Sequence, residues 1–325
     1  MTLSFLFFGH TTDEKWSLVQ QMGITEVIVK LAPELTGQPA IDNLDSFRRS
    51  QEIYAQQGFS IVGLEGDQFD MVPIKLGLAG RERAIDRYCR MLENMGKLGV
   101  GLLCYNFMAT GWYRTHTRIA ERGGALVSGF SYEASQREPL SAYGTFSENQ
   151  IWDNYQYFIE QIMPVAEASG VKMALHPDDP PMSPLNGIGR ILTSAGAVRR
   201  ALSFSNSPAH GLTFCQGTYT TMQEDVPALI QEFGSEKIFF IHIRDVMGTR
   251  ADFRETFHDN GPTDMYATMK AYYRAGLNVP IRSDHVPTMA GEGNEHAGYE
   301  MKGSLFGIGY IKGLMDACEG TSTYA

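Results

Sequence analysis

Short apolar runs rich in branched residues alternate with amphipathic segments through most of this 325-residue chain. The strand-like runs are residues 3–8, 24–29, 59–64, 100–104, 171–175, 209–214, 237–241 and 279–283. Helical spacing of apolar residues predicts helices at residues 13–21, 44–57, 81–98, 147–170, 189–202, 222–233, 264–275 and 303–318. Eight strands, each followed by a helix and apolar enough for burial on both faces, predict an α/β fold, a single-domain (β/α)8 TIM barrel spanning 1–325.

The region after the fourth strand interrupts this alternation. Residues 107–146 are rich in Gly, Ser, Thr and Arg and keep neither a helical nor a strand period. A long irregular segment inside a compact domain is usually functional, so we expect a long loop over an active site. Functional groups of such a barrel lie just after its strands. The predicted active-site loops are therefore about 105–146, 176–188, 244–263 and 284–302.

The composition excludes several classes of partner. Lys and Arg number 27 against 37 Asp and Glu, a formal net charge of −10, whereas nucleic-acid binding depends on clustered basic residues. No apolar run approaches the roughly 20 residues that cross a bilayer, and the first residues lack the features of a secretory signal. Four cysteines in so long a chain do not resemble a disulfide framework. We expect a cytoplasmic protein that binds a small molecule and neither nucleic acid nor membrane.

Four strand-like runs end in residues that bind metals. His176, Cys215, His242 and Asp284 each stand at the end of a different run, on the fifth to eighth predicted strands. Imidazole, thiolate and carboxylate together suit Mn²⁺, Fe²⁺, Co²⁺ or Zn²⁺ better than Ca²⁺ or Mg²⁺. Any one of these residues alone could be a hydrogen-bonded core histidine or a small core cysteine. Their shared position at successive strand ends favours a metal site.

The neighbours of these residues are candidates for further roles. Asp178 and Asp179 either cap the next helix or accept a hydrogen bond from a metal-bound histidine, and the residues alone leave both open. His285, next to Asp284, would lie close to whatever the metal binds and could act as acid or base. Tyr299 could carry a proton, although the residues alone favour an ordinary packed aromatic.

Polar residues in two of the predicted loops could bind a substrate. Asn106 and Arg114 follow the fourth strand, where they could contact hydroxyl groups and a carboxylate, which arginine grips with two parallel hydrogen bonds. Arg244, His258 and Asn260 supply further polar groups after the seventh strand. The alternative for such residues is an ordinary solvated loop. We expect all five to contact the substrate.

Several motifs of the chain resemble those of the D-mannonate dehydratases. The His-Pro-Asp-Asp-Pro-Pro stretch at 176–181 is the most specific of them. The others are Cys-Tyr-Asn-Phe-Met at 104–108, Gly-Leu-Thr-Phe-Cys at 211–215, Phe-His-Asp-Asn-Gly at 257–261, Thr-Asp-Met-Tyr at 263–266, Asp-His at 284–285 and Gly-Tyr at 298–299. They follow one another in the family's order from the first strand to the last helix.

This resemblance implies a xylose-isomerase-like barrel that binds one Mn²⁺ or Fe²⁺ ion. The implied metal ligands are His176, Cys215, His242 and Asp284, and the implied acid/base pair is His285 and Tyr299. The implied reaction converts D-mannonate into 2-keto-3-deoxy-D-gluconate and water, within hexuronate (glucuronate) catabolism. The family also leads us to expect a homo-oligomer.

The chain departs from the family pattern at three places. Members often have an Arg-Trp-Tyr-Gly-like element on the first strand, where this chain has Leu-Phe-Phe-Gly at 6–9. An Arg-Pro-Asp-His element reads Arg-Ser-Asp-His at 282–285, and an arginine near the last helix is replaced by Lys-Gly-Ser at 302–304. These departures leave the metal ligands intact and bear on substrate identity.

Three alternatives follow. The first is a related sugar-acid dehydratase with a different substrate. The second is a xylose-isomerase-like sugar isomerase or epimerase, although such sites tend to hold more carboxylate ligands and no cysteine. The third is a non-catalytic protein with a structural zinc, which is usually bound by Cys and His at short spacings.

Overall fold

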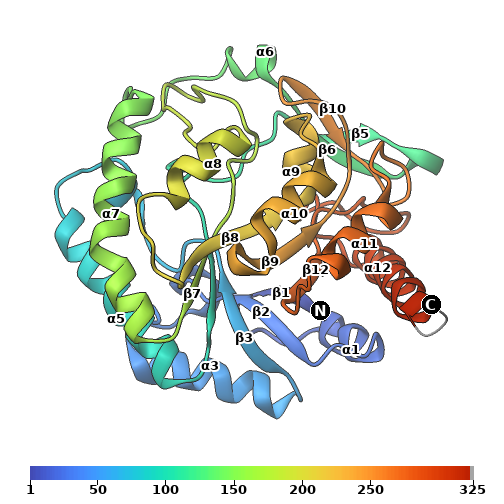
Figure 1. The fold of residues 1–325 in the computed structure, drawn as a ribbon, viewed down its shortest axis with the longest axis horizontal. Coiled ribbons are helices and arrows are strands. Elements are labelled where there is room, and N and C mark those ends of the chain that lie inside the picture. Colours follow the sequence, from blue (N-terminus) through green and yellow to red (C-terminus); the bar gives the residue numbers. More distant parts are fainter. Residues whose placement is uncertain (323–325) are drawn as a thin grey trace.

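Eight parallel strands close into a barrel in the computed structural model, which describes residues 1–322. Around the barrel the order is β1-β12-β9-β8-β7-β4-β3-β2 (Figure 1). The strands are β1 (Thr2–Phe8), β2 (Glu26–Lys30), β3 (Ser60–Glu65), β4 (Leu102–Tyr105), β7 (Lys172–Leu175), β8 (His210–Cys215), β9 (Ile238–Ile243) and β12 (Pro280–Ser283). The predicted (β/α)8 barrel is confirmed.

Helices surround the barrel and cover its apolar outer face (Figure 1). The longer ones are α1 (Glu14–Gln21), α3 (Leu44–Gln56), α5 (Arg81–Lys97), α7 (Glu148–Ala168), α8 (Ala195–Leu202), α10 (Val226–Lys237), α11 (Met265–Arg274) and α12 (Met301–Ser322). The capping box predicted at Ser147 is present, with Gln150 completing it. Inside the barrel, the core consists of Leu6, Ile28, Leu102, Cys104, Ala174, Phe239 and Phe240.

Two predicted helix boundaries were wrong, and in both places side-chain capping decides where the helix begins. Helix α8 begins at residue 195 instead of 189 because the Ser194 side chain accepts a hydrogen bond from the Ala197 backbone N–H. The segment predicted as one helix at 222–233 is divided between α9 (Gln216–Thr221) and α10, which begins after the cap residue Asp225. The short helices α2 (Pro33–Thr36) and α4 (Val72–Lys75) were not predicted.

The predicted irregular loops 107–146 and 244–263 form a second sheet, which is the main correction to the sequence interpretation. The sheet has the order β10-β11-β6-β5, built from β5 (His116–Ala120), β6 (Leu126–Ser131), β10 (Val246–Thr249) and β11 (Asp252–Glu255), and α6 (Tyr132–Ser135) follows β6. Phe253 lies opposite Phe130 in its register, and both are buried. β5 with β6 and β10 with β11 are local antiparallel pairs, and only the pairing of β11 with β6 joins distant segments. Strands of four to six residues are too short to show a clear period in the sequence.

Among residues 1–322, no helix combines the length and the apolar character that a membrane crossing requires.

Gly211 on β8 offers a test of how tightly the barrel is packed. A Cβ atom there would overlap the Phe239 ring and the Lys237 carbonyl oxygen. We expect Gly211→Ala to lower the free energy of unfolding by about 1–3 kcal/mol, measured by urea denaturation. Gly309→Ala on the exposed side of α12, where a Cβ meets open space, is the control and should be neutral or stabilising by up to about 1 kcal/mol. Equal stability of the two variants would contradict the close approach of β8 and β9.

Candidate metal centre

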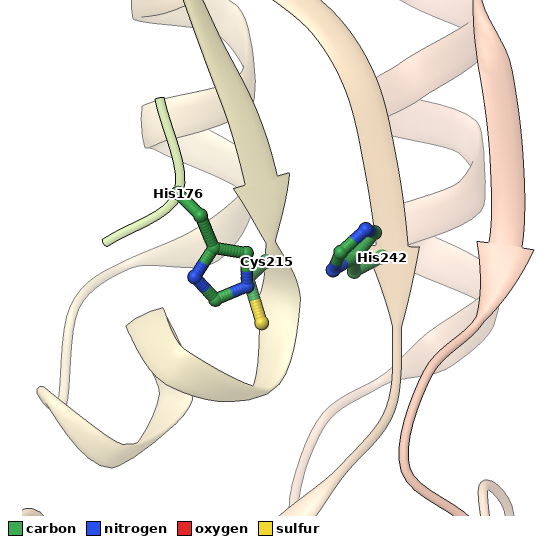
Figure 2. Close-up of side chains that lie close together, drawn as sticks. All are labelled: His176, Cys215 and His242. Carbon is green, nitrogen blue, oxygen red and sulfur yellow. The ribbon is translucent and has the colours of Figure 1, made fainter. Parts of the chain in front are cut away.

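Three of the predicted ligands come together at the carboxyl ends of neighbouring strands. His176 directly follows β7, Cys215 ends β8, and His242 lies on β9 (Figure 2). Each can offer one ligand atom, and these atoms all lie within 4.8 Å of one another. His176 Nδ1 is 2.7 Å from the Pro177 carbonyl oxygen. Because a carbonyl only accepts hydrogen bonds, Nδ1 carries the proton and Nε2 is left with a lone pair for a metal.

Asp284, the fourth predicted ligand, borders this group without belonging to it. Its Oδ2 lies 3.6 Å from Cys215 Sγ, and its Oδ1 lies 3.9 Å from His242 Nδ1. The two oxygens also contact Arg244 Nε and Arg282 Nη2, each at 3.0 Å. Burial raises the pKa of the Asp284 carboxyl, but neighbouring positive charges outweigh burial and hold it well below its usual range. The ionised carboxylate therefore stands beside the three other donors.

A second group, Glu65, Cys104 and His242, also has ligand atoms within 4.8 Å of one another. Its donors suit a metal less well. Glu65 is paired with Arg282, at 2.6 and 3.1 Å, much as Asp284 is, so the difference lies in the cysteine: burial holds the pKa of the Cys104 thiol well above its usual range. A thiol must lose its proton to bind a metal, so the group of His176, Cys215 and His242 is the better site. With Asp284 beside it, this nitrogen, sulfur and oxygen set fits a first-row divalent ion.

The predicted acid/base pair is in direct contact. His285 Nε2 lies 3.0 Å from Tyr299 Oη, and His285 Nδ1 lies 3.2 Å from Glu255 Oε1. The aromatic rings of Phe8 and Trp112 pack against this pair. Burial, followed by the charge of Asp284, raises the pKa of Tyr299 well above its usual range. The phenol is therefore protonated at neutral pH and donates to Nε2, while Nδ1–H donates to Glu255.

Glu255 belongs to a fully buried network of charges. Arg114 donates to Asp179 Oδ2 at 2.8 Å and to Glu255 Oε1 at 2.6 Å, and its Nη1 forms an ion pair with Asp179 Oδ1 at 2.8 Å. Arg244 bonds the two oxygens of Glu255 at 2.8 and 2.7 Å and Asp179 at 3.0 Å. The two arginines predicted to contact a substrate carboxylate thus hold protein carboxylates. Asp179 likewise pairs with arginines, and its predicted role beside a histidine ligand finds no such contact among residues 1–322.

The remaining predicted site residues are Asn106, His258, Asn260 and Asp178, and only Asn106 faces the cavity described below. Asn106 Oδ1 accepts hydrogen bonds from Lys75 Nζ and the Met108 backbone N–H, both at 3.0 Å. His258 is buried beside the Ile243 carbonyl oxygen at 2.9 Å, and burial lowers its pKa to about 4. Asn260 donates to Glu121. Asp178 accepts from the Leu192 backbone N–H at 2.8 Å, so it anchors the loop after β7.

A cavity of about 290 Å³ joins two of the four candidate ligands to the acid/base pair, and Cys215 and His242 are not among its lining residues. His176, Asp284, His285 and Tyr299 line it, together with Asn106. Its wall also contains Phe8, Trp112 and Arg282. Three further residues of the wall were not singled out from the sequence: Lys30, Glu65 and Asp67. Arg114, Arg244, His258 and Asn260 lie outside its wall. A larger cavity, about 700 Å³, opens at the other end of the barrel, around Gly101, Lys237 and Pro280, away from these groups.

Comparison with known proteins agrees with this geometry. The D-mannonate dehydratase (UxuA) family profile matches residues 1–139 and 132–324. The mannonate dehydratase of Shouchella clausii is 32% identical over 356 residues, covering 98% of each chain. Mannonate dehydratase 2 of Halalkalibacterium halodurans is 35% identical over 288 residues, 78% of this chain and 83% of that relative. The chain belongs to the D-mannonate dehydratase family.

A solved member of the family has the same fold. The chain matches the crystal structure of mannonate dehydratase from Streptococcus suis serotype 2 with a TM-score of 0.89 and 27% sequence identity. The match covers 99% of this chain and 96% of the Streptococcus suis chain. Family membership makes this chain a hydro-lyase. The family is metal-dependent. The grouping of donor atoms from His176, Cys215 and His242 agrees with this property.

The first-strand stretch in which this chain differs from the family pattern, residues 6–9, contributes to the cavity. Leu6 and Phe8 both line the wall, and Phe8 packs edge-on against Tyr299 with ring centroids 5.2 Å apart. Lys302, at the third departure, bonds the Ala290 carbonyl oxygen and is not part of the wall. The substitutions on β1 are therefore the ones in a position to alter what the cavity accepts.

The Glu255 network predicts how stability depends on pH. Burial raises the pKa of Glu255, but Arg244 and Arg114 outweigh burial and lower it to about 2, from an ordinary value of 4.5. A lowered pKa means that this carboxylate contributes its full stability above about pH 4.5 and loses it as the pH falls towards 2. Urea denaturation of the metal-free protein between pH 7 and pH 3 should show this decline.

Glu255→Gln should weaken this pH dependence and lower stability at pH 7 by roughly 3–5 kcal/mol, because it leaves two buried arginines short of a partner. Glu133→Gln, which removes an exposed pair with Arg137, should change stability by less than about 0.5 kcal/mol. An unchanged acid profile in Glu255→Gln would contradict the assignment of Glu255 as an ionised partner of these arginines.

Proposed function

We propose that this protein dehydrates D-mannonate to 2-keto-3-deoxy-D-gluconate and water. The observation that carries the proposal is a single cavity lined by two of the candidate metal ligands, His176 and Asp284, and by the hydrogen-bonded pair of His285 and Tyr299. Support also comes from the curated mannonate dehydratases, which align with almost the whole chain. Removing water from a sugar acid requires a base, an acid and charge stabilisation, and the cavity wall supplies groups for all three.

We assign one divalent ion, Mn²⁺ or Fe²⁺, to His176, Cys215, His242 and Asp284. The chemistry of the four donors supports this assignment. When bound, the ion would act as a Lewis acid towards negative charge that builds on substrate oxygens. Arg244 and Arg282 contact both oxygens of Asp284 and keep its carboxylate ionised and oriented towards Cys215 and His242.

We assign the proton transfers to His285 and Tyr299. His285 Nε2 removes the C2 proton, the C2–C3 double bond forms, and the C3–O bond breaks. Tyr299 donates its proton to the departing hydroxide, which leaves as water, and the enol becomes the 2-keto acid. The proton on His285 then returns to the Tyr299 phenolate across their 3.0 Å contact. Glu255, bonded to Nδ1, stabilises the imidazolium that exists between these two transfers.

One observation supports a second candidate, a dehydratase for a related sugar acid. Leu6 and Phe8 are apolar residues in the cavity wall where family members often have Arg and Tyr. Such a change alters polar contacts with substrate hydroxyls and leaves the candidate ligands and the proton pair themselves present, although Phe8 packs against Tyr299. A different configuration along the sugar chain is the form that a changed substrate would take.

A panel of aldonic acids tests both candidates. The Mn²⁺-loaded protein should convert D-mannonate, or a stereoisomer of it, into a 2-keto-3-deoxy acid, detected by a colorimetric assay and mass spectrometry as loss of one water. Protein stripped of metal by a chelator should be inactive and should recover with Mn²⁺ or Fe²⁺. Formation of an isomeric sugar without loss of water would instead support the isomerase or epimerase alternative, and bound zinc without turnover would support a structural metal.

Tyr299→Phe tests the assignment of the acid. The variant should lose roughly 10²- to 10⁴-fold in kcat, because no proton reaches the departing hydroxide. Its metal content, measured by mass spectrometry, should equal that of the wild type. Tyr143→Phe, which removes an exposed phenol, is the control and should keep full activity. Near-normal turnover in Tyr299→Phe would overturn the assignment.

The cellular setting belongs to the same proposal. We place the reaction in hexuronate (glucuronate) catabolism, in the cytoplasm, with a small sugar acid as the binding partner and neither nucleic acid nor membrane. We also propose a homo-oligomer. Family resemblance supports the pathway and the oligomer, and the acidic net charge of −10 supports a partner other than nucleic acid.

A further inference from the structure

The cavity wall contains an unusual cation, Lys30. It ends β2, lies beside Phe8 of β1 in the strand register, and is partly exposed. Its side chain lines the cavity together with Asp67 and Trp112. In the barrel order, β2 lies four strands from β8 in either direction, so Lys30 faces the candidate metal ligand Cys215 across the mouth of the barrel.

The carboxylates that line this cavity all have a cationic partner within the protein. Each of the four has an ion-pair partner at 3.0 Å or less. The pairs are Asp67 with Lys75 at 2.7 Å, Glu65 with Arg282 at 2.6 Å, Asp179 with Arg114 at 2.8 Å, and Asp284 with Arg282 at 3.0 Å. Each of these acids therefore has a cation of the protein in direct contact, with Arg282 shared by Glu65 and Asp284.

Lys30 differs from the other cation in the wall. The guanidinium of Arg282 contacts the carboxylates of Glu65 and Asp284. Its Nη1 also donates to the Ser283 carbonyl oxygen at 2.8 Å. Lys30, by contrast, has no carboxylate within 4.0 Å and no side-chain hydrogen bond among residues 1–322. A half-enclosed ammonium group without a partner attracts an anion, because ion pairs strengthen as water is excluded.

We propose that Lys30 binds the carboxylate of the substrate and so selects sugar acids over neutral sugars and polyols. This inference rests on the proposed function, in which the substrate is a sugar acid. Loss of the C2 proton places negative charge on the adjacent carboxylate, so an ammonium group there also stabilises the transition state. Lys30 is thus assigned both to substrate binding and to the rate of proton removal.

Lys30→Met tests this assignment, because methionine keeps much of the side-chain length and removes the charge. We expect KM for the sugar acid to rise on the order of 10- to 100-fold and kcat to fall. D-Mannitol, in which a hydroxymethyl group replaces the carboxylate, should inhibit Lys30→Met and the wild type with the same inhibition constant. Lys30→Arg should recover part of the loss in KM.

Lys302→Met is the matched control, since it removes the same charge from a residue outside the cavity wall. It should leave KM unchanged, and an increase equal to that of Lys30→Met would overturn the proposal as a general electrostatic effect. An unchanged KM in Lys30→Met would overturn it directly. Equal weakening of mannitol binding would also overturn it, because Lys30 would then contact a hydroxyl group.

A binding measurement separates this inference from the proposed function. If the wild type dehydrates no aldonic acid, the proposed function fails, and calorimetric titration of D-mannonate and the other panel acids into the Mn²⁺-loaded wild type, Lys30→Met and Lys302→Met still tests Lys30. Weaker binding in Lys30→Met alone would support carboxylate recognition. Equal affinities in all three proteins, or no binding to the wild type, would overturn it.

Discussion

One buried guanidinium, that of Arg244, connects the parts of this site. It contacts three carboxylates from different segments: Asp179 after β7, Glu255 on β11, and Asp284 after β12. A planar group with five donors can satisfy several acids at once, whereas three buried carboxylates without it would be strongly destabilising. A side chain on Gly217 would overlap the Arg244 side chain. The glycine after β8 therefore makes room for this connection.

The network joins metal binding to proton transfer. Asp284 stands beside the candidate ligands, and Glu255 bonds the histidine that contacts Tyr299. Arg244 contacts both Asp284 and Glu255. A change in the charge of one carboxylate therefore alters the electrostatic field at the other. The second sheet is what brings Glu255 to this place, because β11 pairs with β6 above the strand ends. The two excursions of the chain that interrupt the barrel pattern are thus structural components of the candidate site.

The success of sequence reasoning differed between classes of residue. Strands and candidate ligands could be predicted because parallel strands have long apolar runs, and a polar residue that ends such a run must lie at one rim of the barrel. That rule does not apply to Glu255, and it places Lys30 at the rim without distinguishing it from other residues that end strands. Glu255 lies on a short strand within a polar stretch, and Lys30 resembles any lysine that ends a strand. Arg114 and Arg244 were predicted to contact the substrate, whereas their partners in the structure are the protein carboxylates Asp179 and Glu255.

The sequence by itself determined the barrel, the order of its strands along the chain, the candidate ligands and the family. These properties depend on local periodicity and on motifs, which are readable along the chain. Only the tertiary structure decided which charges neutralise one another, because ion pairs such as Arg282 with Glu65 join residues 217 positions apart. Within residues 1–322, Lys30 has no ion-pair partner. A charge is available for substrate only when the fold gives it no other partner, and that depends on distances in space.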